Sequence, residues 1–309
     1  MNRNNMRNMN NLSGKSLEND PHFNGSDGLS IISTRGKELN HPLHDHEEME
    51  LTYIQNARGA KRIIGSHIGE LDDMELILAG PHLPHGWVAN NCHGMDVKEV
   101  TIHFHKELFH ESLLGKNQLF YIRRLFEDAK RGIKFSKGVA ELVAPRILSL
   151  EQRTGFELIL ELFSLLHQLS VAADSRMLSD ITYTQDIYWY NSRRLERAFQ
   201  YMNMHFEKPI TLEEVAGIAN MSAASFSRFV KTHTGRTFTD NLVEIRMGHV
   251  SRMLMETTHS IAEIAYTCGF NNLANFNRIF KAQKGLTPKE FKREIHRMAM
   301  VPGAAAQAV

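Results

Sequence analysis

Residues 260–291 read SIAEIAYTCGFNNLANFNRIFKAQKGLTPKEF, and they predict two short helices joined by a tight turn. Apolar side chains recur at helical spacing in the first half of this stretch: Ile261, Ile264 and Ala265. Gly269 follows them, and glycine readily takes the left-handed conformation in which many helices end. The next helix begins near Leu273 and ends at Gly285, after which a Thr-Pro pair is typical of the start of another helix.

The second of these helices has one apolar face and one polar, basic face. The inward residues are Phe276, Ile279 and Phe280. The outward residues are Ala274, Asn275, Asn277, Arg278 and Lys281. A short exposed helix of this kind has the form of an element that enters the major groove of DNA. A solvated face on an isolated helix has the same pattern, so the rest of the chain must decide between the two interpretations.

The same unit occurs once earlier in the chain. Residues 211–221 align with residues 260–270 at an offset of 49. Beyond the turn the offset is 50, which places one additional residue near Asn272. The residues of the first copy that recur in the second are Phe226, Arg228, Lys231, Gly235 and Thr237. Two copies indicate a duplicated supersecondary unit and are too few for a solenoid.

The pattern F-x-R-x-F-K-x-x-x-G-x-T-P-x-x-F over residues 276–291 resembles the signature of AraC/XylS-type transcription regulators. Two helix-turn-helix units at this separation are also similar to that family. The resemblance covers the last third of the chain. It implies an all-α DNA-binding domain over residues 191–298, in which residues 238–255 form the helix that joins the two units.

The resemblance also implies which residues reach base edges. They are Ala224, Ser225, Ser227 and Arg228 in the first unit, and Ala274, Asn275, Asn277 and Arg278 in the second. The chemistry agrees, because arginine can donate two hydrogen bonds to guanine, asparagine can pair with adenine, and an alanine methyl can meet the thymine methyl. Lys231 and Lys281 suit phosphate contacts, which add affinity without sequence information. The implied partners are double-stranded DNA and RNA polymerase.

Charge is unevenly distributed along the chain, although the net formal charge is only +1. Residues 190–309 carry 16 Lys and Arg against 10 Asp and Glu, whereas residues 1–189 carry 20 against 25. A basic half beside an acidic half suggests that only one half meets phosphate.

The two cysteines, Cys92 and Cys268, are far apart and have no metal-like spacing. This pattern fits a reducing compartment and argues against a disulfide scaffold. Residues 1–14 lack the apolar core of a secretory signal, and no apolar run approaches the length of a membrane span. We therefore expect a soluble, cytoplasmic protein with no membrane partner.

Several short strand-like segments before residue 105, the first and last of which alternate between apolar and polar residues, predict an all-β barrel or sandwich. The segments are residues 49–54, 62–64, 74–78 and 97–104. The spacing His44-x-His46-x-x-x-Glu50, followed by a Gly-Pro-His-Leu-Pro-His run that ends at His85, resembles the two motifs of a cupin barrel. The second motif departs from the common form, which has glycine where His82 stands. A cupin-like sensing domain is also what the AraC resemblance implies at the N-terminus.

His44, His46, Glu50 and His85 would converge inside such a barrel. Three imidazoles and a carboxylate suit iron, manganese, nickel or zinc. The family resemblance instead implies an organic effector without a metal, to which the same side chains could donate hydrogen bonds. We therefore expect no cofactor and keep a divalent transition metal at these four residues as the alternative. Ordinary packing is a third possibility, because more histidines lie in this region: His41, His82, His93, His103 and His105.

Residues 107–170 change to a helical period. Residues 139–150 and 156–169 predict an antiparallel helix pair, and the second carries apolar residues on more than one face. This breadth, with the family resemblance, predicts a homodimer interface, and packing against the barrel is the alternative. The expected domains are a disordered tail at 1–29, a sensing and dimerisation domain at 30–170, a linker at 171–190, the DNA-binding domain at 191–298 and a disordered tail at 299–309.

The sequence therefore predicts an α+β chain. An N-terminal cupin-like β-barrel with a helical dimerisation segment precedes an all-α domain with two helix-turn-helix units. The expected function is sequence-specific transcription regulation, as an activator controlled by a small-molecule effector and, by the family resemblance, in carbohydrate metabolism. No phosphate loop, nucleophile elbow or cysteine beside a base indicates catalysis, so we expect no enzyme. The rival interpretation is a metal-dependent cupin enzyme joined to a DNA-binding domain.

Overall fold

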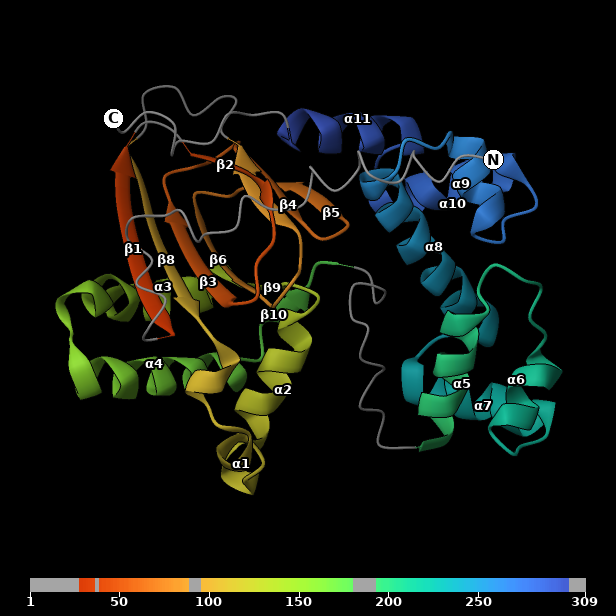
Figure 1. Cartoon of the computed structure of the whole chain (residues 1–309), viewed down its shortest axis with the longest axis horizontal. Coiled ribbons are helices and arrows are strands. Elements are labelled where there is room, and N and C mark those ends of the chain that lie inside the picture. Colours follow the sequence, from red (N-terminus) through yellow and green to blue (C-terminus); the bar gives the residue numbers. More distant parts are fainter. Residues whose placement is uncertain (1–27, 37–38, 89–95, 180–192, 300–309) are drawn as a thin grey trace, which may run out of the picture. The chain divides into compact units, whose positions relative to one another are not determined.

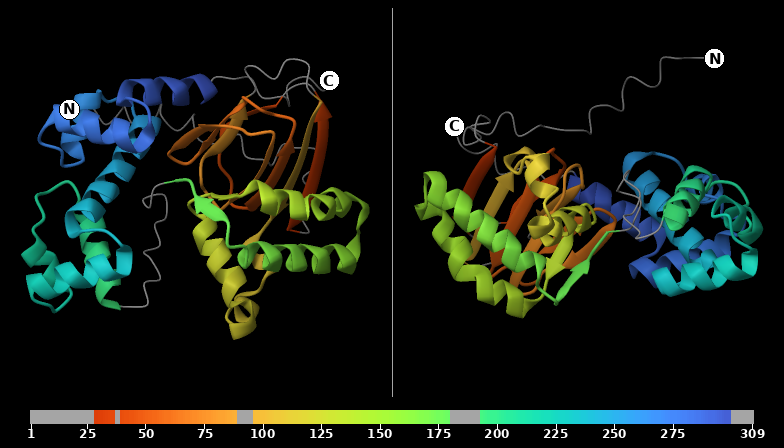
Figure 2. Two further views of the ribbon diagram at one scale, coloured as in Figure 1. Left: turned by 180° about the vertical axis from the view of Figure 1, so that it is seen from behind. Right: turned by 90° about the horizontal axis from the view of Figure 1, so that it is seen from below.

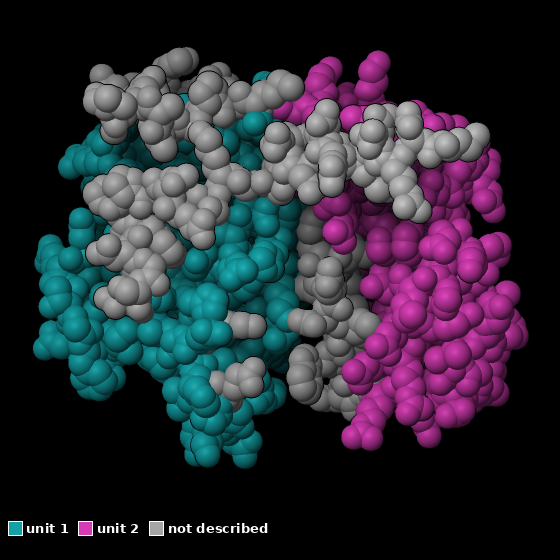
Figure 3. Space-filling model, in the orientation of Figure 1, with its two compact units in different colours: residues 1–179, 297–309 teal, residues 180–296 magenta. Residues whose placement is uncertain are grey.

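The computed structural model describes residues 28–36, 39–88, 96–179 and 193–299 (Figure 1). The chain divides into two compact units, residues 1–179 with 297–309 and residues 180–296 (Figure 3). All described strands belong to the first unit, and the described part of the second contains helices only. Most of the two predicted tails, and residues 180–190 of the predicted linker, lie outside the described residues.

Two antiparallel sheets form the first unit (Figure 2). The six-stranded sheet has the order β1 (Leu29–Gly36), β8 (Val97–Phe104), β3 (Met49–Gln55), β6 (Met74–Ala79), β9 (Ile133–Phe135) and β10 (Ser175–Met177). The four-stranded sheet has the order β2 (Asn40–His44), β7 (His85–Val88), β4 (Lys61–Ile64) and β5 (His67–Glu70). No pairing among these described strands joins one sheet to the other, so the predicted barrel is an open pair of sheets.

The two faces of the six-stranded sheet have opposite character. On β3, Leu51 and Tyr53 lie in an apolar core, whereas Glu50 and Thr52 on the alternate face are buried polar residues. Strand β8 repeats this pattern with Ile102 against Thr101. Since successive side chains of a strand point to opposite faces, one face is apolar and the other, which meets the four-stranded sheet, is polar.

Three helices cover the apolar face of the six-stranded sheet (Figure 2). They are α2 (Phe120–Ala129), α3 (Lys137–Ser149) and α4 (Gly155–Ser170), preceded by the short turn α1 (Glu111–Leu114). The predicted helix pair is therefore present as α3 and α4. Within α4, Leu162 and Leu166 are fully buried in the core, because they face the sheet.

The predicted boundaries of the first domain need correction at both ends. β1 begins at Leu29, inside the predicted tail. Residues 175–177 were expected in the linker but form β10, which pairs with β9, and the buried Ser179 hydroxyl accepts a hydrogen bond from the Ser66 N–H at 3.0 Å. The unit therefore extends to Ser179 and not to residue 170. A three-residue edge strand is too short to give a periodic signal in the sequence.

The second unit contains seven described helices. They are α5 (Arg193–Met204), α6 (Leu212–Ile218), α7 (Ala223–Thr234), α8 (Phe238–Glu256), α9 (Ile261–Thr267), α10 (Leu273–Lys284) and α11 (Pro288–Ala299). The long α8 joins the pair α6–α7 to the pair α9–α10 (Figure 1). α11 ends one residue inside the predicted C-terminal tail. None of the helices in the described ranges is long and apolar enough to cross a lipid bilayer.

The two helix pairs are built by the same local signals. α6 and α9 each begin with a capping box, in which Thr211 and Ser260 exchange hydrogen bonds with Glu214 and Glu263 respectively. α7 and α10 both end at a glycine with a φ of 73°. The duplication predicted from the sequence is thus a duplication of structure.

The turn of the second pair is longer by one residue. In the first pair the left-handed residue Asn220 lies two positions before the N-cap Ser222. In the second pair the left-handed residue Gly269 lies three positions before the N-cap Asn272. Asn271 is therefore the additional residue, which confirms the insertion predicted from the change of offset.

Candidate DNA interface and effector site

Helices α7 and α10, called the recognition helices below, each have one buried and one exposed face. Phe226 and Val230 are buried on α7, and Phe276 and Phe280 are buried on α10. A capping side chain precedes each helix. The Ser222 hydroxyl accepts a hydrogen bond from the Ser225 backbone N–H, and the Asn272 side-chain oxygen accepts one from the Asn275 backbone N–H. Packing and capping thus fix the direction in which the remaining side chains point.

The predicted base-contacting residues lie on the exposed faces of the recognition helices. On α7 the exposed residues are Ala224, Ser227, Arg228 and Lys231, while Ser225 is half-buried because its hydroxyl bonds to Ser222 at 3.0 Å. On α10 all the predicted residues are exposed: Ala274, Asn275, Asn277, Arg278 and Lys281. Arg278 Nη2 donates to Asn275 Oδ1 at 2.9 Å, which orders both side chains on the exposed face. Their roles toward DNA stay predictions.

The predicted effector residues converge between the two sheets. The candidate ligand atoms of His44, His46, Glu50 and His85 all lie within 4.8 Å of one another. Glu50 Oε2 is 3.2 Å from His46 Nε2 and 3.1 Å from His85 Nε2. Glu50, His46 and His85 are buried, and His44 is half-buried. Four residues separated by up to 41 positions therefore form one compact group, called the Glu50 cluster below.

A fifth member, His103 of β8, was not among the predicted site residues. Its Nε2 lies 3.0 Å from Glu50 Oε2, because Glu50 and His103 are directly opposite each other in the pairing of β3 with β8. A signal was present in the sequence, where Glu99, Thr101 and His103 alternate with apolar residues and give β8 a polar face. Choosing His103 among the neighbouring histidines requires the register of the strands.

Backbone carbonyls determine which nitrogen of each imidazole faces the cluster. His44 Nδ1 donates to the Pro42 carbonyl at 2.8 Å, and His85 Nδ1 donates to the Leu83 carbonyl at 2.7 Å. A carbonyl oxygen only accepts, so both Nδ1 atoms carry a proton and both Nε2 atoms point inward. Histidines that ligate metals usually donate their other ring N–H to a carbonyl or carboxylate in this way.

Electrostatics divide the histidines of the cluster. Burial, helped by repulsion from His85, lowers the pKa of His44 to about 3, so His44 is neutral and offers the lone pair of Nε2. Burial also opposes charge on Glu50 and His85, but their mutual attraction outweighs it. The pKa of Glu50 is therefore held well below its usual range, and the pKa of His85 is raised. An anionic centre ringed by imidazole nitrogens can hold a cation.

Two more buried carboxylates cross the space between the sheets. Glu99 Oε2 pairs with His41 Nε2 at 2.8 Å. Glu75 accepts from Arg62 Nη1 at 2.8 Å and from Lys134 Nζ at 2.5 Å. Glu50, Glu75 and Glu99 all lie on the six-stranded sheet, and their partners on the four-stranded sheet are cationic or imidazole groups. Polar contacts therefore hold the two sheets together on this side.

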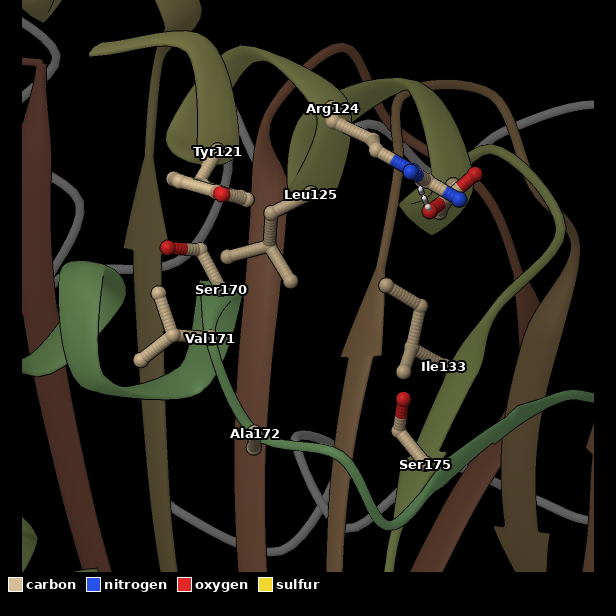
Figure 4. A pocket seen from close by; sticks show the side chains of 9 residues that line it. Tyr121, Arg124, Leu125, Ile133, Ser170, Val171, Ala172 and Ser175 are labelled. Carbon is tan, nitrogen blue, oxygen red and sulfur yellow. Dashed lines mark ion pairs between the residues drawn. The ribbon is translucent and has the colours of Figure 1, made fainter. Parts of the chain in front are cut away.

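A pocket of about 420 Å³ lies elsewhere in the first unit (Figure 4). It is formed by α2, the end of α4, β9 and β10, and Arg124 pairs with Asp128 across 3.7 Å beside it. It shares no residue with the Glu50 cluster. Its lining residues are Tyr121, Arg124, Leu125, Asp128, Ile133, Ser170, Val171, Ala172 and Ser175.

The family model and the curated relative reported next are similar to the second unit. A family model described as a helix-turn-helix domain matches residues 215–294. The HTH-type transcriptional activator RhaS of Enterobacter sp. (strain 638) is 29% identical over 103 residues, which are 33% of this chain and 37% of RhaS. The chain thus spans about a third of the length of the curated relatives it matches.

Two solved structures are similar to the same region. The C-terminal domain of AraT, a response regulator from Geobacillus stearothermophilus, is 35% identical, with 33% of this chain and 86% of that chain covered and a TM-score of 0.32. An AraC-type transcriptional regulator from Chromobacterium violaceum is 23% identical, with 35% and 95% covered and a TM-score of 0.33. The family model, the similarity to RhaS and the duplicated unit identify the C-terminal third of the chain as an AraC-type helix-turn-helix domain.

Proposed function

We propose that this protein is a sequence-specific transcriptional activator whose DNA affinity is controlled by a small-molecule effector. The observation that carries the proposal is the pair of recognition helices, each capped, each packed by two buried aromatic or aliphatic residues, and each exposing a polar, basic face. RhaS, a relative, is named a transcriptional activator, which supports activation here. RNA polymerase is then the second macromolecular partner.

Two recognition helices in one domain suit two successive major grooves, whose centres lie about 34 Å apart on B-DNA. The half-site should therefore contain two short conserved blocks about 10 base pairs apart. Binding-site selection with the full chain at fixed salt tests this proposal. A single conserved block, or none, would contradict the use of both helices.

Replacing Arg228 with alanine should weaken binding by about 1–3 kcal/mol and relax the base preference in one block only. The reason is that an exposed arginine can donate two hydrogen bonds to one guanine, whereas alanine makes no hydrogen bond to that base. Arg278→Ala should do the same in the other block. Per-position preferences from binding-site selection with each variant are the measurement.

Lys231→Ala is the matched control on the same exposed face of α7. It should weaken all sequences alike and flatten the salt dependence, because a phosphate contact releases counterions without reading a base. If both arginine variants keep the wild-type sequence profile and lose only affinity, Arg228 and Arg278 are backbone contacts.

The proposed effector site is the polar space between the two sheets, at the Glu50 cluster. The buried carboxylates and imidazoles there can exchange hydrogen bonds with the hydroxyl or carboxyl groups of a polar organic molecule, so carbohydrates are the first class to test. The interior of the cluster is only a few ångströms wide, so such a molecule would meet the half-buried His44 at its rim. A ligand thermal-shift panel that includes His44→Ala tests this site.

A divalent transition metal is the second candidate for the same residues. His44, His46, Glu50 and His85 fit it, since three imidazoles and one carboxylate converge, all but His44 are buried, and two of the imidazoles are anchored through Nδ1. The metal would be held by these four side chains and would supply a Lewis-acidic centre for an effector or, in the rival proposal, for a substrate. His103 would keep Glu50 oriented toward it.

We further propose that the protein acts as a homodimer through exposed apolar residues of α3 and α4. Leu142 and Phe156 are 65% and 74% exposed, which is unusual for side chains of this size, and Leu160 is 52% exposed. The buried Leu162 and Leu166 are not suited to this role. Because Leu162 and Leu166 lie in the core, only the solvent-exposed side of α4 can contribute to the dimer interface.

Charge on this outer side should separate the subunits. Phe156→Glu combined with Leu160→Glu is expected to yield a folded monomer at micromolar concentration, since a carboxylate buried at an interface is strongly unfavourable. Sedimentation velocity of the full chain is the measurement. Phe120→Glu, at an exposed phenylalanine of α2, is the control and should stay dimeric. A wild-type chain that is monomeric under these conditions would contradict the dimer.

Control of DNA binding would then be a population shift. The effector stabilises one arrangement of the sheets and dimer helices, and thereby one presentation of the recognition helices. β10 is the last described strand of the first unit before the chain continues to α5.

A further inference from the structure

Arg246 lies in the middle of α8, the helix that joins the two helix-turn-helix pairs. Its Nε donates to the Phe206 carbonyl at 2.8 Å, and its Nη2 donates to the Lys208 carbonyl at 2.8 Å. Both carbonyls belong to the connection between α5 and α6, which leads into the first pair. Because a guanidinium is a rigid planar fork, two hydrogen bonds fix its orientation and that of the backbone it binds.

The second helix pair reaches the same guanidinium through the turn between α9 and α10. Gly269 of this turn has a φ of 81°, and a Cβ added there would lie 2.9 Å from Arg246 Cζ and 2.7 Å from the Phe206 carbonyl oxygen. The turn therefore lies against both the guanidinium and the backbone of the connection that leads into the first pair. Only glycine permits this approach, both for its backbone conformation and for lack of space.

One helical turn beyond Arg246, His249 contacts the end of α5 and the same connection. Its ring is stacked on Phe206, with centroids 3.5 Å apart and planes 6° apart, and its Nε2 lies 2.9 Å from Asn203 Oδ1. Two successive helical turns of α8 therefore contact the end of α5 and the connection that follows it. Hinge motion between the two pairs would have to break these contacts together.

We propose that Arg246 is a positioning residue that fixes the spacing and angle between the recognition helices, and with them the spacer length that the protein accepts in DNA. The inference rests on the proposed use of both helices. One additional base pair between two blocks moves the second groove by about 3.4 Å and rotates it by about 35°. If the two recognition helices are held rigidly, they cannot both enter grooves displaced in this way. If the domain can bend between them, they can.

The test compares operators in which the two selected blocks are separated by the preferred spacer or by one base pair more or less. Wild-type protein should lose about tenfold or more in affinity when the spacer changes by one base pair. Arg246→Met should bind the preferred spacer more weakly and reduce that discrimination to about threefold or less, because the second helix can reorient. Circular dichroism confirms that each variant is folded at the temperature of the assay.

Arg252→Met is the matched control, because Arg252 lies on the same helix, carries the same charge, is exposed and bonds only to Glu256 among the contacts described for it. It should keep the wild-type spacer profile. If Arg246→Met does not fold, Arg246→Lys takes its place in the test. Lysine keeps the positive charge but lacks the planar guanidinium, so this variant should also reduce the discrimination between spacer lengths. A variant that loses affinity equally for all spacers, with the profile unchanged, would overturn the inference. A wild-type profile that is flat would instead contradict the proposed use of both recognition helices.

Discussion

Replacing Glu75 with leucine should lower the free energy of unfolding of the first unit by about 3–5 kcal/mol. The substitution leaves Arg62, which is 1% exposed, without its carboxylate between the two sheets. A buried charge without a partner costs far more than a lost surface ion pair. Lys134 also loses its closest acceptor, although it can still reach Asp72 at 3.3 Å.

Urea unfolding followed by Trp87 fluorescence measures this effect. Trp87 is 2% exposed and lies directly opposite Arg62 in the pairing of β4 with β7, so its emission reports on the affected region. A Trp189→Phe background leaves Trp87 as the single tryptophan. Urea is preferable to guanidinium, which would screen the charges under test.

Two controls separate a lost ion pair from a general packing defect. Arg62→Met together with Glu75→Leu removes both charges and should recover most of the stability, since apolar replacement of a buried pair is often neutral. Asp96→Asn breaks the exposed pair of Asp96 with Arg35 and should leave the urea midpoint unchanged. A Glu75→Leu protein with wild-type stability would show that the pair between the sheets is dispensable.

Removing two imidazoles from the Glu50 cluster should abolish metal binding if a cation is held there. Buried four-ligand sites bind divalent zinc with about 10–16 kcal/mol, so His46→Ala combined with His85→Ala should weaken binding by at least about a thousandfold. The measurement is metal content after loading with zinc, nickel, manganese or iron(II) and desalting, together with a chelator competition. The protein must carry no polyhistidine tag.

His110→Ala is the control for unspecific binding by surface histidines, because His110 is exposed and outside the cluster. It should retain the wild-type metal content. Wild-type protein that stays metal-free after loading, yet binds an effector normally, would reject the metal and leave the organic effector site. Loss of metal without loss of effector binding would mean that the two sites are separate.

Strands were predictable where one face is apolar. β3 and β8 alternate over six or more residues, because one face meets the helices and the other meets the second sheet. β2 and β7 gave no such signal, since the sequences NHPLH and HGWV mix polar residues with proline or glycine. Their place in the sheet depends on contacts with the other sheet, which local periodicity does not record.

The candidate site was predictable in part for the same reason. His44, His46 and Glu50 lie within seven residues, at the end of β2, in the following loop and at the start of β3, so a sequence motif could record their spacing. Glu50 and His103 lie 53 positions apart and meet through the register of β3 with β8. Glu99 and His41 lie 58 positions apart and meet because β8 and β2 face each other across the two sheets. The role of Gly269 was foreseen as a helix end, but its contact with Arg246 depends on how α8 packs.

The additional residue Asn271 makes the two recognition helices unequal as well as different in sequence. The turn before α10 is longer than the turn before α7, so the two helices cannot exchange places on DNA by a simple rotation of the domain. A half-site bound by both helices therefore has polarity, with a head and a tail. A promoter could then distinguish the two orientations of the same half-site, and inverting it in place would reverse which side of the protein faces the transcription start.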